Sequence, residues 1–139
     1  MGHASHSIAI NAEPAAVWNY VGDFNGLARW HPAIAASELE DGGQVRRLTL
    51  RGGGEIVERL LAHDNAQRSC SYSITAGPLP VKRHAATILV DGTGNTSTVD
   101  WRCEFESAGP PDADVTAIFM QIFETGLGNL KTLVEHGKT

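Results

Sequence analysis

The fold of this chain is decided by residues 112–136, which read DADVTAIFMQIFETGLGNLKTLVEH. Apolar residues recur in this stretch at steps of three and four, which predicts one face of a helix of about seven turns. The residues on that face are Val115, Ile118, Phe119, Ile122, Phe123, Leu127, Leu130 and Val134. Gly109-Pro110-Pro111 breaks the chain before the helix, and Asp112 is expected to cap its first turn. A helix with so long an apolar face needs a partner surface.

Gly126 lies near the centre of this apolar face. A glycine inside a helix is less favourable than alanine by about 1 kcal/mol, so its position calls for a reason. One explanation is close contact between the helix and a sheet, and the other is room for a ligand. Room for a ligand is the favoured explanation, in which case Gly126→Leu would fill the space and leave the fold nearly as stable.

The segment before the helix supplies a partner surface. Its alternating patterns predict strands at 34–40, 45–51, 55–63, 68–76, 82–91 and 96–106, after a short strand at 6–10, a helix opening at Pro14 and a second helix near 24–29. The links between strands are short and rich in Gly, Pro, Asp and Asn, which predicts an antiparallel meander. In the last strand Val99, Trp101, Cys103 and Phe105 alternate with polar residues. That apolar side is expected to pack against the long helix.

Length and composition predict one domain spanning residues 1–139, because the chain has 139 residues and is 42% hydrophobic. A formal net charge of -5 argues against nucleic-acid binding, which needs clustered basic residues. Arg46, Arg47 and Arg51 form the one local basic group and are expected on the solvated face of a strand.

Two further absences in the sequence limit the classes of function. Neither an apolar run of membrane-spanning length nor an export signal is present, so we expect a cytoplasmic protein without integral membrane association. The six histidines are scattered and form no HExxH motif, so neither a metal site nor a cofactor is expected. Cys70 and Cys103 are predicted to be free thiols in strands. Homodimerisation is left open.

The order of elements resembles the helix-grip fold of the START-related superfamily, also called SRPBCC, which includes polyketide cyclase/dehydrase-like and lipid-transfer proteins. The resemblance covers essentially the whole chain and rests on Val17-Trp18, Asp23-Phe24, Trp30-His31-Pro32, Glu58-Arg59-Leu60, Tyr72, Gly77-Pro78-Leu79-Pro80-Val81, Trp101 with Phe105, and Gly126-Leu127. It implies an α+β domain in which a curved seven-stranded antiparallel sheet grips the long helix, with two short helices between strands 1 and 2 and a cavity inside. His84 stands where bacterial members of the family often have an aromatic hydroxyl residue.

Within such a cavity, the sequence offers a set of ligand-binding candidates: Trp30, His31, Glu58, Tyr72, Ile74, His84, Trp101, Phe119, Phe123 and Gly126. Each has a structural alternative. Trp30 is expected to pack a corner, His31 to be a solvated imidazole, and Tyr72 to be a core ring. Glu58 has apolar neighbours on both faces of its strand, so periodicity leaves its direction open. His84 alternates in phase with Ala86 and Ile88, which predicts that it points into the cavity.

These candidates lead to three hypotheses about function. The first is a carrier or sensor of a small hydrophobic, aromatic or lipid-like ligand. The second is an enzyme of the cyclase/aromatase or dehydratase type, with Glu58, Tyr72, His84 or His31 as acid-base groups. The third is an interaction module with a filled core and an exposed apolar patch. Catalysis requires at least two titratable groups that converge on the cavity, whereas binding requires a lined void.

Overall fold

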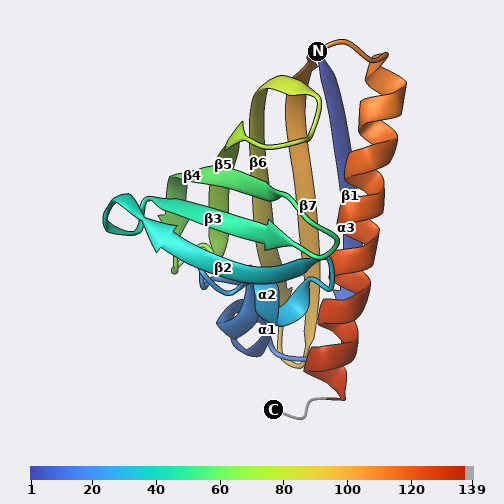
Figure 1. The fold of residues 1–139 in the computed structure, drawn as a ribbon. Helices are drawn as coiled ribbons and strands as arrows, with labels where there is room; N and C mark the ends of the chain where they lie inside the picture. The colour runs from blue at the N-terminus through green and yellow to red at the C-terminus, as the bar shows by residue number, and fades with distance from the viewer. Residues whose placement is uncertain (137–139) are drawn as a thin grey trace.

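A computed structural model describes residues 1–136 and shows seven strands and three helices, with one short 3-10 turn (Figure 1). The chain runs through β1 (Gly2–Ile10), α1 (Pro14–Val21), α2 (Leu27–Trp30), β2 (Ile34–Glu40), the 3-10 turn η1 (Asp41–Gly43), β3 (Val45–Leu50), β4 (Glu55–Asp64), β5 (Ser69–Ala76), β6 (Val81–Thr93), β7 (Thr96–Ser107) and α3 (Asp112–Glu135). This order confirms the expected α+β helix-grip arrangement.

The seven strands form one antiparallel sheet in the order β1-β7-β6-β5-β4-β3-β2. β1 begins at Gly2, four residues earlier than its predicted start at His6, and pairs with β7 from Gly2↔Phe105 to Ile10↔Ser97. The sheet is strongly curved, because β2, β3 and β4 run steeply across the direction of β6 and β7 (Figure 1). The predicted antiparallel meander is therefore confirmed.

α3 runs beside β1 and β7 and buries one face against the concave side of the sheet (Figure 1). Its buried residues are Val115, Phe119, Phe123, Gly126, Leu127 and Leu130. The ring of Phe123 stacks on Trp101 of β7 with 4.6 Å between centroids. Ile118 differs from the prediction, because it lies at the edge of the apolar face and is 37% exposed.

The start of α3 also differs from the prediction. Pro111 occupies the N-cap position, and no side chain caps the helix there. Asp112 is instead the first helical residue, and its carboxylate lies 3.8 Å from the amino group of Met1. The expectation that Asp112 caps the helix is therefore wrong, although Asp112 and Asp114 still place negative charge in the first turn, where the helix dipole favours it.

Residues 1–136 contain both cysteines of the chain. Cys70 and Cys103 are free and buried. In this part of the chain, none of the helices is long and apolar enough to cross a membrane.

Candidate ligand-binding cavity

A cavity of about 70 Å³ lies between the concave face of the sheet and α3. Eight of the ten residues predicted to bind a ligand line this cavity: His31, Glu58, Tyr72, Ile74, His84, Trp101, Phe119 and Phe123. The other two, Trp30 and Gly126, do not line it. The remaining lining is apolar and includes residues that the prediction missed, among them Leu50, Leu79 and Ile122.

The opening of the cavity follows from the exposure of its lining residues. Ala33 is exposed, whereas Leu50, Leu79 and Ile122 are half-buried. Leu50 ends β3, Leu79 belongs to the loop between β5 and β6, and Ile122 lies on α3. The cavity therefore meets the solvent between the turn that joins β3 to β4, the loop that joins β5 to β6, and the middle of α3. The polar residues Glu58, Tyr72 and His84 lie deeper and are all buried.

Glu58, Tyr72 and His84 together form the polar wall of the cavity. At one end of this wall, Glu58 forms a buried ion pair with Arg46. Glu58 is 5% exposed and Arg46 is 6% exposed. Nε and Nη2 of Arg46 lie 2.8 and 2.7 Å from Oε1 of Glu58. The guanidinium also donates from Nη1 to the carbonyl oxygen of Phe24 at 2.8 Å and lies over the rings of Phe24 and Tyr72. Burial raises the pKa of the Glu58 carboxyl, and Arg46 opposes this rise by stabilising the charged form.

Arg46 was expected on the solvated face of a strand, and that expectation is wrong. The sequence contains a signal that corrects it. The hairpin around Gly52 pairs residues at equal distances from that glycine, so Leu48 pairs with Ile56 and Arg46 with Glu58. Since Leu48 and Ile56 are buried, Arg46 and Glu58 lie on the same inward face. The turn could therefore have shown that Arg46 and Glu58 share one face with Leu48 and Ile56, and the burial of these two residues shows that this face points inward.

Tyr72 connects the ion pair with the rest of the polar wall. Its hydroxyl accepts a hydrogen bond from Nε1 of Trp101 at 3.0 Å, and its ring centroid lies 5.9 Å from that of His84. Burial raises the pKa of Tyr72 well above its usual value, and the nearby Glu58 carboxylate raises it further. The phenol is therefore protonated throughout the physiological pH range.

His84 is 8% exposed and lies on the concave face between Tyr72 and Phe119, whose ring it stacks on at 5.2 Å. Its Nδ1 accepts a hydrogen bond from the backbone N-H of Ile74 at 3.1 Å. The proton of the neutral ring therefore sits on Nε2. Burial lowers the pKa of His84 to about 4, so the ring is neutral at physiological pH.

This lowered pKa predicts that the fold loses stability as the pH falls below about 6.5. Between that pH and about 4, the unfolded chain binds a proton at His84 that the folded chain does not. The free energy of unfolding should therefore fall by about 3 kcal/mol across this window. Urea denaturation of the wild type and of His84→Asn at several pH values measures this effect. The difference in the free energy of unfolding between the two proteins should shrink by about that amount from pH 7 to pH 4. A difference that stays constant with pH would contradict the lowered pKa of His84.

His31 is buried at 3% exposure, so the expectation of a solvated imidazole is wrong. Its Nε2 donates to the backbone carbonyl of Ile122 on α3 at 2.8 Å, while Nδ1 accepts from the N-H of Ala33 at 3.2 Å. Burial lowers its pKa, and the hydrogen bond to Ile122 partly offsets that shift. Both ring nitrogens are therefore used to fix α2 against α3.

The imidazole of His31 also explains Gly126. A Cβ atom on Gly126 would overlap Cδ2 of His31 and would lie 2.9 Å from its Nε2 and 3.1 Å from Cζ3 of Trp101. The space that was expected to admit a ligand is thus filled by protein, and the ligand explanation for Gly126 is wrong. Trp30 likewise packs a corner, with its ring 5.4 Å from that of Trp101.

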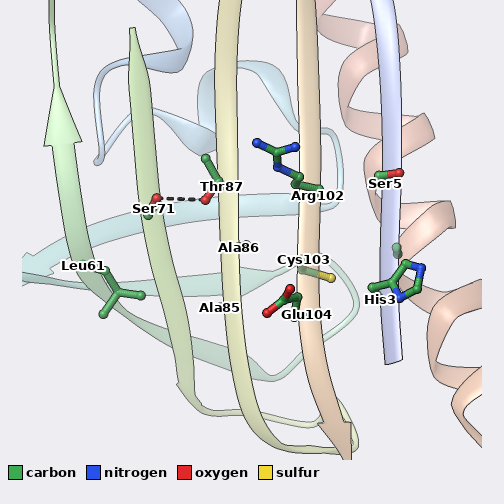
Figure 2. A pocket seen from close by; sticks show the side chains of 11 residues that line it. His3, Ser5, Leu61, Ser71, Ala85, Ala86, Thr87, Arg102, Cys103 and Glu104 are labelled. Carbon is green, nitrogen blue, oxygen red and sulfur yellow. Dashed lines mark hydrogen bonds between the residues drawn. The ribbon is translucent and has the colours of Figure 1, made fainter. Parts of the chain in front are cut away.

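A larger hollow of about 510 Å³ lies on the opposite, outer face of the sheet (Figure 2). It is bordered by side chains of β1, β4, β5, β6 and β7, including His3, Leu61, Thr87, Arg102 and Glu104. Most of these residues are exposed. One wet face is ordinary for an antiparallel sheet. Because the inner cavity encloses buried polar groups and this hollow does not, the inner cavity is the candidate site.

The chain resembles known proteins over its whole length. The sequence profile of the family described as polyketide cyclase/dehydrase and lipid transport matches residues 1–135. The solved structure of the protein XoxI from Bacillus cereus is 37% identical, with 96% of each chain covered and a TM-score of 0.93. Comparison with curated proteins gives no match.

Two more distant structures show the same fold. A START superfamily protein from Mycobacterium smegmatis is 16% identical, with 99% of this chain and 100% of that chain covered and a TM-score of 0.81. Norcoclaurine synthase from Thalictrum flavum, in complex with dopamine and hydroxybenzaldehyde, is 19% identical, with 99% of this chain and 88% of that chain covered and a TM-score of 0.74. The chain therefore belongs to the polyketide cyclase/dehydrase and lipid transport family and has the helix-grip fold of the START superfamily.

Proposed function

We propose that this protein binds a small, largely apolar or aromatic molecule in the cavity between the sheet and α3. The observation that carries the proposal is the lining, which combines apolar and aromatic side chains with a few buried polar groups. This composition is typical of small-molecule sites. The cavity volume of about 70 Å³ is smaller than most ligand pockets, so the occupant is small or displaces the half-buried leucines at the opening.

A relative with the same fold supports a ligand of this size. Norcoclaurine synthase is described in complex with dopamine and hydroxybenzaldehyde, both of which contain one aromatic ring. A molecule of one ring would fit the present chain if its polar group entered the cavity and its ring lay between Leu50 and Leu79 at the opening.

An enzyme of the cyclase or dehydratase type is the second candidate, because Glu58, Tyr72, His84 and His31 all line the same cavity. Their protonation states favour binding over catalysis. A general base works best with a pKa near the operating pH. Tyr72 has a pKa well above 10, Nδ1 of His84 is occupied by the Ile74 N-H, and His31 uses both ring nitrogens. Glu58 is held by Arg46. These groups can orient and polarise a ligand.

Native mass spectrometry of the purified protein tests the proposed function. We expect a fraction with an additional small mass that disappears on denaturation. Ile74→Phe should fill the cavity and abolish this fraction, because Ile74 lines it. Ser73→Phe is the matched control, since neighbouring residues of a strand point to opposite faces and this change adds the same ring outside the cavity. The proposal would be contradicted if the purified wild-type protein carried no additional mass and still carried none after incubation with a small-molecule extract of cells.

A further inference from the structure

Two polar atoms of residues that line the cavity have no hydrogen-bond partner within residues 1–136. The first is Nε2 of His84, whose Nδ1 is occupied by the Ile74 N-H. The second is Oε2 of Glu58, because the contacts of Arg46 converge on Oε1. Every fully enclosed side-chain nitrogen or oxygen in the described part of the chain has a partner. The two free atoms must therefore reach open space. Glu58 lines the inner cavity, whereas His84 lines both this cavity and a shallow hollow beside Met1 and Phe105. The inner cavity is the open space that the two residues share, and the rings of Tyr72 and Phe119, between which His84 lies, line it as well.

The two atoms differ in hydrogen-bonding character. Nε2 of His84 carries the proton of the neutral imidazole and is a donor. Oε2 of Glu58 belongs to a carboxylate, because a protonated Glu58 would leave the buried guanidinium of Arg46 without a counter-charge, so it is an acceptor. An occupant that satisfies both must offer one acceptor and one donor.

The charge of this wall is balanced. The Arg46–Glu58 pair has no net charge, and the guanidinium is already engaged by Glu58 and by the Phe24 carbonyl. His84 is neutral and the Tyr72 hydroxyl is protonated. A cationic ligand could pair with Oε2 of Glu58, but it would leave the His84 donor unpaired and would add a second positive charge beside Arg46. An anionic ligand would face the Glu58 carboxylate without a free cation. Burying a charge without a partner is strongly unfavourable.

We propose, building on the function proposed above, that the cavity selects a neutral molecule of about one ring whose polar group accepts a hydrogen bond from His84 Nε2 and donates one to Glu58 Oε2. A primary carboxamide has this pattern, because its carbonyl oxygen accepts and its NH₂ group donates. The carboxylate of the same shape has no donor, and the amidinium has no acceptor. Among ligands of the same size, affinity then depends on the charge of the polar group and on its pattern of hydrogen-bond donors and acceptors.

Benzamide, benzoate and benzamidine provide this test, since they share one ring and nearly one shape. Isothermal titration of the full chain at pH 7 should show binding of benzamide and affinities at least about tenfold weaker for the two charged probes. His84→Asn retains an acceptor near the Nδ1 position for the Ile74 N-H but lacks the Nε2 donor. It should weaken benzamide binding about fivefold to tenfold, as expected for one lost hydrogen bond. Circular dichroism checks that this variant is folded.

The outcomes separate this inference from the proposed function. Binding of all three probes with similar affinity, stronger binding of a charged probe, or unchanged benzamide binding in His84→Asn would overturn the inference and leave a ligand-binding cavity in place. Absence of benzamide binding at millimolar concentration would also overturn it. Benzamide binding that persists unchanged in Ile74→Phe would instead place the ligand outside the cavity and count against the proposed function itself.

Discussion

Replacing Arg46 with alanine is expected to destabilise the fold by about 3 to 5 kcal/mol, because the Glu58 carboxylate would then be buried without its counter-charge. The change also removes the hydrogen bond to the Phe24 carbonyl and the contacts of the guanidinium with two aromatic rings. Urea denaturation at pH 7 measures the effect. It is the largest that we expect from a single substitution in this chain.

Two controls identify the buried charge as the cause. The double variant Arg46→Met/Glu58→Leu removes both charges and keeps apolar volume, so it should recover most of the lost stability. Arg47→Ala removes the neighbouring arginine, whose contacts with Glu40 and Glu55 are exposed, and should change the denaturation midpoint only slightly. If Arg46→Ala were as mild as Arg47→Ala, the buried ion pair would not contribute as described.

Gly126 and Gly128 should respond to alanine with opposite signs. A Cβ at Gly126 collides with the His31 imidazole and presses on Trp101, whereas a Cβ at Gly128 meets no atom within 4 Å. Both changes gain about 1 kcal/mol of helix propensity. Gly128→Ala should therefore stabilise the protein by up to about that amount. Gly126→Ala should destabilise it by about 2 to 3 kcal/mol, because the overpacked His31 loses its hydrogen bonds to Ile122 and Ala33.

Thermal or urea denaturation of the two variants provides the comparison. Gly126→Leu should be more destabilising than Gly126→Ala, since the collision begins at the first side-chain carbon. Equal stabilisation by alanine at both positions would show that the space beside Gly126 is open, as the sequence alone had suggested.

The fold could be predicted from the sequence because its signals are periodic and local. The 3.6-residue pattern after Pro111 gave the long helix, and the alternation around Trp101 gave the buried face of β7. The short glycine-rich links gave an antiparallel order. Each of these signals lies within one element or one turn.

The site could be predicted only in part, because its geometry depends on contacts between distant segments. Periodicity placed Tyr72, His84, Trp101 and Phe123 on inward faces, and all four line the cavity. It did not show that His31 reaches the carbonyl of Ile122, 91 residues away, and so fills the space beside Gly126. Nor did composition distinguish the buried Arg46 from the exposed Arg47.

The most direct test of the central claim is the location of a bound molecule, which isotope-filtered nuclear Overhauser effects on the protein with benzamide would measure. A ligand in the inner cavity predicts effects from the ring protons to Leu50, Ile74, Leu79 and Ile122. Effects to Leu61, Ala85 and Thr87 instead would place the molecule in the larger hollow on the outer face of the sheet (Figure 2) and contradict the assignment of the cavity as the binding site.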